Sequence, residues 1–183
     1  MKIKLKDKIF NYRFATKRDI DEIYRFDQII NKDLDDKKYY QLHDKENLLK
    51  KLNSGKIIVV FYNNTLVAWA IVFTTINEKS FSNLELTSKT SKFVGFLAAT
   101  AVSKKYRGYG LQRFLIKKRL DYLKTKNKKF AFIGVDPNNN YSINNIKESG
   151  FRFLKEVTMD HRVLKNNKIV IEKEVYQNYK IKL

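Results

Sequence analysis

The chain has 183 residues, of which 43% are hydrophobic, 31% are charged and none is cysteine. This composition predicts one globular domain with a sizeable core, and it excludes disulfides, thiolate metal ligands and a cysteine nucleophile. The formal net charge of +19 suits a phosphate-rich partner such as nucleic acid or a nucleotide cofactor. However, lysine far outnumbers arginine, and asparagine and isoleucine are abundant, which favours codon bias over a dedicated nucleic-acid surface.

The sequence contains no targeting, membrane or metal-binding signal. No stretch resembles the roughly 18 apolar residues of a membrane span, and the N-terminal segment is too charged for a signal-peptide core. We therefore expect a soluble, cytoplasmic protein without a membrane partner. His43 and His161 lie too far apart for metal-ligand spacing, so we expect no metal site.

The first third of the chain predicts a strand and two helices. The strand is expected near Ile9 to Phe14. A helix should follow it, because Thr16 and Asp19 resemble a capping box. The apolar residues at helical spacing behind this box are Ile20, Ile23, Phe26 and Ile30. A second, shorter helix is expected from Asp44 to Gly55, where glycine is a plausible stop.

The remaining chain alternates between expected strands and helices. "KIIVVFY" and "TLVAWAIVF" predict a tight antiparallel hairpin, because they are joined by Asn63 and Asn64 and asparagine tolerates left-handed backbone angles. Residues 74–92 have little periodicity and predict a long loop. The later expected elements are a buried strand "FVGFLAATAV", a helix from Leu111 to Lys124, a strand "KFAFIGV", a short helix from Ser142 to Ser149 and two strands around Asn166-Asn167. This alternation predicts a mixed α/β domain.

The segment "KKYRGYGLQR", residues 104–113, joins that buried strand to the next expected helix. Two of the six glycines of the chain, Gly108 and Gly110, lie in it. Unpaired N–H groups at a helix start bind phosphate, and glycine lets the backbone approach closely. Lys104, Lys105 and Arg107 add the positive charge that a pyrophosphate would require. The turn is a candidate phosphate site, and a plain turn with solvated lysines is the alternative.

Two better-known phosphate motifs do not fit this turn. The dinucleotide fingerprint needs a third glycine where Arg113 stands, and the Walker motif needs Gly-Lys-Ser/Thr, which is absent. The turn instead resembles the coenzyme A loop of the GNAT superfamily of N-acyltransferases, which reads Gln/Arg-x-x-Gly-x-Gly/Ala between the fourth strand and the third helix. Lys105, Gly108 and Gly110 fill this motif with one substitution, lysine for glutamine or arginine.

A second signature of the same family follows its fifth strand. It consists of an asparagine, a small residue three positions later, and Gly-Phe at the end of the fourth helix. In "VDPNNNYSINNIKESGF" these positions are Asn139, Ser142, Gly150 and Phe151. The order of elements also resembles the family from about residue 9 to 176. The resemblance implies an α/β (α+β) fold with a mixed, mostly antiparallel sheet of about six to seven strands, flanked by about four helices, with strands four and five splayed to hold coenzyme A.

The resemblance implies acetyl-CoA as the cofactor. Backbone N–H groups of the turn would hold the pyrophosphate, the end of the fourth strand would pair with the pantetheine arm, and Asn139 would contact the same arm. The implied cofactor-binding residues are Thr100, Ala101, Val102, Lys105, Arg107, Gly108, Tyr109, Gly110, Leu111, Gln112, Asn139 and Ser142. For Asn139, a plain turn residue in "PNNN" is the alternative.

Acyl transfer to an amine needs a neutral amine, a donor for the developing oxyanion and a proton for the thiolate. The resemblance implies direct attack in a ternary complex, with a backbone N–H at the strand-four bulge, here Val102, serving the oxyanion. Ile146 stands where the family often has a proton-donating tyrosine, and "FLAATAV" lacks the glutamate that many relatives use as a base. Tyr141 and Glu85 are the nearest substitutes. A packed aromatic residue, a surface glutamate and proton transfer through water are the alternatives.

The acceptor site is expected in "NKDLDDKKYYQLHD", between the first two helices. Its acidic and aromatic residues would attract a cationic amine, and an exposed loop is the alternative. The candidate substrate residues are Asp33, Asp35, Asp36, Tyr39 and Tyr40. The sequence thus predicts an acetyl-CoA-dependent N-acetyltransferase of a small-molecule or protein amine, acting as a monomer or homodimer. A non-catalytic acyl-CoA-binding module and a domain acting on nucleic acid or RNA-linked substrates are the alternatives.

Overall fold

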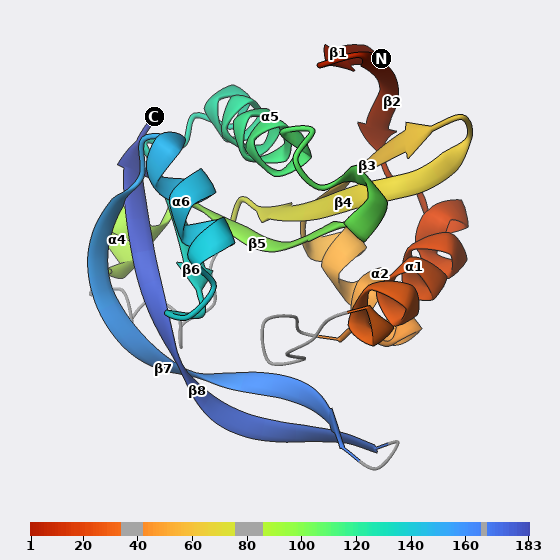
Figure 1. Cartoon of the computed structure of the whole chain (residues 1–183). Coiled ribbons are helices and arrows are strands. Elements are labelled where there is room, and N and C mark those ends of the chain that lie inside the picture. The colour runs from red at the N-terminus through yellow and green to blue at the C-terminus, as the bar shows by residue number, and fades with distance from the viewer. Residues whose placement is uncertain (34–41, 76–85, 166–167) are drawn as a thin grey trace.

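The residues that the structure describes form one eight-stranded sheet, whose course through the molecule is seen in Figure 1. This computed structural model describes residues 1–33, 42–75, 86–165 and 168–183. The strand order is β1-β2-β3-β4-β5-β6-β8-β7, and every neighbouring pair is antiparallel except β5 and β6. The strands are β1 (Lys2–Leu5), β2 (Lys8–Phe14), β3 (Lys56–Tyr62), β4 (Thr65–Phe73), β5 (Val94–Val102), β6 (Phe130–Val135), β7 (Arg152–Lys165) and β8 (Lys168–Lys182).

Helices cover both faces of this sheet. Among the described residues the longer helices are α1 (Ile20–Lys32), α2 (Lys45–Ser54), α5 (Leu111–Thr125) and α6 (Asn140–Glu148), and α4 (Ser88–Ser91) is a single turn. α1 and α2 pack on one face of β3 and β4 around the buried Trp69, whereas α5 packs on the opposite face through Phe114 and Leu115. Figure 1 shows α5 above β4 and β5, with α1 and α2 below. The mixed α/β fold class is confirmed.

Local sequence signals account for several element boundaries. Asn63 and Asn64, between β3 and β4, adopt φ values of 47° and 61°, so the predicted hairpin is confirmed. Asp44 caps α2, because its Oδ1 accepts a hydrogen bond from the backbone N of Asn47 at 2.6 Å. α2 then ends before Gly55, as predicted. These elements form where the residues themselves favour a turn or a helix end.

Two segments differ from the sequence-based expectation. The basic N-terminal lead forms β1, in which Ile3 and Leu5 pack inward and the alternate lysines face solvent. This edge strand raises the sheet from the expected six or seven strands to eight. Residues 74–92 were expected to form only a loop, yet α4 begins there because Thr87 accepts a hydrogen bond from the backbone N of Thr90. No helix in the described ranges is both long and apolar enough to cross a membrane.

β5 and β6 separate part of the way along their length. Their parallel pairing ends at Leu97 and Ile133, while β5 continues to Val102. Beyond that point β5 keeps its antiparallel pairing with β4 but has no pairing with β6. β5 and β6 correspond to the strands that the family counts as its fourth and fifth. The family-based expectation that these two strands splay is therefore confirmed.

A bulge in β5 lies at the beginning of the separated segment. The pairing of β5 with β4 changes register between Leu97 and Thr100, so that Ala98 and Ala99 together face Ile71. An extra residue bends a strand and increases its twist. The bulge therefore helps to turn the end of β5 away from β6.

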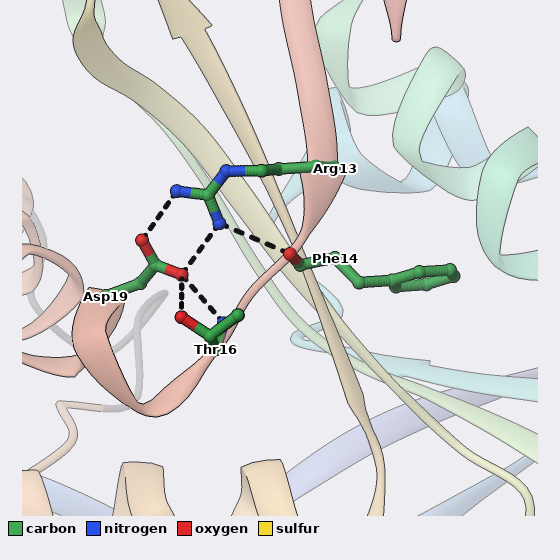
Figure 2. Close-up of polar contacts among 4 residues, drawn as sticks. All are labelled: Arg13, Phe14, Thr16 and Asp19. Atoms are coloured by element: carbon green, nitrogen blue, oxygen red, sulfur yellow. Dashed lines mark hydrogen bonds and ion pairs between the residues drawn. The ribbon is translucent and has the colours of Figure 1, made fainter.

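An ion pair joins the end of β2 to the beginning of α1 (Figure 2). Arg13 donates from Nη1 and Nη2 to the two carboxylate oxygens of Asp19, at 2.7 Å each. Oδ2 of Asp19 also accepts a hydrogen bond from the backbone N of Thr16 at 2.7 Å, as the predicted capping box requires. Hydrogen bonding from Arg13 is the main cause that lowers the pKa of Asp19 to about 2, against an ordinary value of 3.8.

Replacing Asp19 with asparagine is expected to destabilise the protein at neutral pH by about 1 to 2 kcal/mol. A carboxylate whose pKa is lowered by folding stabilises the folded state above its ordinary pKa of 3.8, and this contribution is lost as the pH falls toward about 2. Urea denaturation should show the difference between the two proteins shrinking over that range. Glu46→Gln, which removes an exposed pair with Lys50, serves as a control with a small effect. A constant difference down to pH 2 would contradict this account.

Candidate active site

The glycine turn connects β5 to α5 through a short 3-10 helix, Lys104–Tyr106. Gly108 and Gly110 adopt φ values of 80° and 83°, a left-handed conformation that glycine adopts without steric cost. A methyl group added at either position would meet no atom of the described residues within 4 Å. The glycines are thus required by the backbone conformation, and the space beside them is open.

The first turn of α5 presents backbone donors at this space. Its first intrahelical hydrogen bond runs from the N of Phe114 to the O of Gly110 at 2.9 Å. The N–H groups of Leu111, Gln112 and Arg113 precede it, and no side chain among the described residues caps the helix. Donors of this kind, at the positive end of a helix dipole, bind anions.

The side chains of the turn divide between the core and solvent. The ring of Tyr109 lies 6.0 Å from that of Phe10, at an interplanar angle of 69°, and this contact holds the turn against the sheet. Lys105 and Arg107 are exposed. The contact between Tyr109 and Phe10 therefore fixes the backbone of the turn to the sheet, while the side chains of Lys105 and Arg107 remain in solvent.

Two residues near the end of β5 direct backbone groups away from β4. The N of Ser103 donates to the O of Val67 at 2.9 Å, and hydrogen-bonded positions alternate along an antiparallel ladder. Ala101 therefore also bonds to β4, whereas the N–H and C=O groups of Thr100 and Val102 point to the side from which β6 has separated. An extended ligand can pair with such a strand edge.

Gln112 connects the turn to the second family signature, on α6. Its Nε2 donates to Oγ of Ser142 at 2.7 Å, and its Oε1 accepts from Nδ2 of Asn145 at 2.9 Å. Asn139 caps α6, because its Oδ1 accepts from the N of Ser142 at 3.1 Å. The Nδ2 of Asn139 makes no hydrogen bond with the described residues. The two signatures, 30 residues apart, thus meet at one place.

The catalytic candidates are described only in part. Tyr141 is 87% exposed, and Glu85 lies outside the described residues. The bulge in β5 is at Ala98 and Ala99, not at Val102, where the family-based prediction put it. The predicted position of the bulge was wrong because a register shift depends on how β5 pairs with β4, and the sequence of β5 alone does not reveal that pairing. Val102 still presents its N–H group to the open side of β5.

The predicted acceptor residues are described only in part. Asp33 is the C-terminal cap of α1, and its backbone N donates to the O of Ile29 at 3.0 Å. The other four, Asp35, Asp36, Tyr39 and Tyr40, lie outside the described residues. The role of all five stays a prediction.

A buried polar cluster that joins α1 to β4 was not predicted from the sequence. Asp27, 0% exposed, accepts a hydrogen bond from Nε1 of Trp69 at 2.9 Å and lies 2.9 Å from Nδ1 of His43. Trp69 is the β4 partner of Ala101. Asp27 lies four residues after Ile23 and three before Ile30, on the buried face of α1. An acidic residue at this apolar spacing is the sequence signal that could have found it.

A model of the Acetyltransferase (GNAT) family matches residues 18–151. This match covers the glycine turn, the end of β5 and the α6 signature, and the chain therefore belongs to the GNAT acetyltransferase family. The family uses acetyl-CoA as its acyl donor. The open space beside Gly108 and Gly110 and the outward backbone groups of β5 fit this cofactor. No curated protein sequence matches the chain at a significant level.

Solved acetyltransferases share the fold at low sequence identity. A GNAT-family acetyltransferase from Listeria monocytogenes is 17% identical, with a TM-score of 0.74 and 100% of both chains covered. The acetyltransferase yncA from Salmonella typhimurium, solved with acetyl-CoA, is 15% identical, with a TM-score of 0.67 over 94% of this chain and 93% of that chain. A ribosomal-protein-alanine N-acetyltransferase from Brucella melitensis is 16% identical, with a TM-score of 0.68 over 94% and 99%.

Proposed function

We propose that residues 1–183 form one acetyl-CoA-dependent N-acetyltransferase domain that acetylates a primary amine of a small molecule or a protein. One observation carries the proposal: the unpaired edge of β5 leads directly into an open, left-handed glycine turn at the beginning of α5. A strand edge suits an amide-containing arm, and the turn suits a pyrophosphate. Coenzyme A has these two parts joined in this order.

The proposed cofactor contacts are mostly backbone groups. N–H groups from Arg107 to Gln112 would bind the pyrophosphate, with Lys105 and Arg107 adding charge from solvent. Thr100 and Val102 would pair with the pantetheine arm. Nδ2 of Asn139 would donate to the same arm, since its Oδ1 is engaged in capping α6. The link from Gln112 to Ser142 and Asn145 holds these two sets of groups at a fixed separation.

Bound acetyl-CoA would supply an activated acyl thioester. The N–H of Val102, directed to the open side of β5, is the proposed donor to the developing oxyanion. β5 has no titratable side chain, so we propose that water takes the proton of the amine, with Glu85 as the protein alternative. Tyr141 is a solvent-exposed candidate for protonating the thiolate. Positioning of the two reactants would then provide most of the acceleration.

The acceptor class is the less constrained part of the proposal. An amine is supported by family membership and by the name of the Brucella relative, which acetylates an alanine of a ribosomal protein. Asp33 at the end of α1 belongs to the acidic segment that would attract a cationic amine. These features favour an amine over a hydroxyl acceptor.

Two titrations test the proposal. After nucleic acid has been removed, calorimetry with acetyl-CoA and with desacetyl CoA should show micromolar binding. Thiol release should then be measured with a panel of polyamines, aminoglycosides and peptides with free N-termini. Absence of binding to either coenzyme, especially if RNA co-purifies, would contradict the proposal.

A non-catalytic acyl-CoA-binding module is the second candidate. It is favoured by Ile146, which is 1% exposed in the core between α5, α6 and β6 and therefore provides neither an acid nor space for one. Tight acetyl-CoA binding without thiol release for any amine in the panel would support this candidate over the enzyme.

A further inference from the structure

Arg119 of α5 is completely buried and directed at the bulge of β5. It is 0% exposed. Its Nη1 donates to the O of Ile71 on β4 at 3.2 Å and to the O of Ala98 on β5 at 3.1 Å. Its Nε donates to the O of Leu115, one turn earlier on the same helix, at 3.2 Å.

The two strand carbonyls belong to residues of the register shift. Ala98 is one of the two bulge residues that face Ile71, so both lie where the regular ladder between β4 and β5 is interrupted. A bulge disrupts the hydrogen bonds of the ladder locally, and a buried carbonyl without a partner is costly. Arg119 supplies the donor that the disrupted ladder lacks.

The charge of Arg119 has no acidic partner among the described residues. Its Nη2 also has no hydrogen-bond partner there. Burial lowers the pKa of Arg119 to about 9, so the guanidinium stays positively charged at neutral pH. A buried, unpaired cation is costly. A residue that only filled this space would be apolar, and the position of the cation at the bulge therefore calls for a specific role.

We propose that Arg119 is a positioning residue that fixes the β5 bulge and thereby holds Thr100 and Val102 in the orientation that pairs with the acyl-carrying arm of coenzyme A. The inference rests on the proposed function. Parallel pairing of β5 with β6 ends at Leu97, one residue before Ala98. A guanidinium that binds both Ala98 and Ile71 therefore holds β5 at the point where it separates from β6.

The test compares two ligands on four proteins. Coenzyme A uses both the turn and the β5 edge, whereas adenosine 3′,5′-bisphosphate can use only the turn. Binding of each should be measured by calorimetry for the wild type, Arg119→Met, Arg119→Lys and the control Ile116→Val. Ile116 is also fully buried on α5, but its apolar side chain donates no hydrogen bond to the carbonyls of the bulge. Thermal melting reports the stability of every variant.

The expected result is selective. Arg119→Met should weaken coenzyme A about tenfold, the equivalent of about one lost hydrogen bond, and leave the bisphosphate unchanged. With an amine that is active in the panel above, the kcat of thiol release by Arg119→Met should fall on the order of a hundredfold, because a displaced strand misplaces the reacting groups. Arg119→Lys should recover part of both losses, since its ammonium group can donate to one of the two carbonyls. Ile116→Val should alter only the melting temperature.

Each other outcome identifies what has failed. If the wild type binds the bisphosphate but gains nothing from the pantetheine arm, the proposed function fails at β5. If the wild type gains affinity from the arm and Arg119→Met keeps that gain, the inference about Arg119 is wrong. Equal weakening of both ligands would also overturn it, because that pattern indicates general loss of structure. If Arg119→Met does not fold, Arg119→Lys decides by the same comparison.

Discussion

Replacing Gly108 with valine is expected to abolish measurable coenzyme A binding while the protein remains folded. Gly108 has a φ of 80°, and a side chain there would project into space that no described residue occupies within 4 Å. The fold should therefore lose only the cost of the strained backbone, about 1 to 3 kcal/mol. The phosphate would lose charge-assisted hydrogen bonds of about 1.5 to 3 kcal/mol each, so loss of two raises the Kd by about a hundredfold or more.

The matched control for Gly108→Val is Gly150→Val. Gly150, after α6, has a φ of 89°, so valine imposes similar backbone strain, and its added Cβ would approach Cδ1 of Ile181 at 3.3 Å. This control should lower the melting temperature and leave the Kd for coenzyme A unchanged. Calorimetry and circular dichroism melts measure both properties. If Gly108→Val binds coenzyme A as the wild type does, the phosphate is not bound at this turn.

Much of the fold follows from local residue choices. The capping of α2 by Asp44, the left-handed Asn63 and Asn64 and the start of α5 after Gly110 all depend on neighbouring residues, and each of these elements is found where the sequence predicts it. β1 was missed because its lysines make the N-terminal segment look like a short basic lead before the first strand. Only pairing with β2 shows that Ile3 and Leu5 face the core.

The candidate site divides in the same way. The position of the glycine turn between a strand and a helix is visible in the sequence, because turn chemistry is local. The bulge and the roles of Arg119 and Asp27 depend on contacts distant in sequence, such as the 48 residues from Arg119 to Ile71 and the 42 from Asp27 to Trp69. Both residues stand at the spacing of the buried apolar residues of their helices, but arginine and aspartate are usually exposed, so residue type alone did not mark either as part of the core.

Replacing Asp27 with alanine is expected to destabilise the protein by about 3 to 5 kcal/mol, a large share of the stability of a domain of this size. Asp27 is 0% exposed and accepts a hydrogen bond from Trp69 while lying 2.9 Å from Nδ1 of His43. Its removal would leave the indole N–H buried without that acceptor and open a cavity between α1 and β4. Urea denaturation monitored by Trp69 fluorescence measures the loss.

Asp21→Ala on the same helix is the control for Asp27→Ala. Asp21 pairs with Lys45 at 2.7 Å, but its side chain is 68% exposed, so its removal should have little effect. Asp27→Asn keeps the shape and an acceptor for Trp69, and should lose less than Asp27→Ala. Because Trp69 is the β4 partner of Ala101, loosening this cluster should also weaken coenzyme A binding at the adjacent end of β5. If Asp27→Ala is as stable as Asp21→Ala, the cluster does not hold α1 to the sheet, and the cofactor edge of β5 must be supported from the α5 side alone.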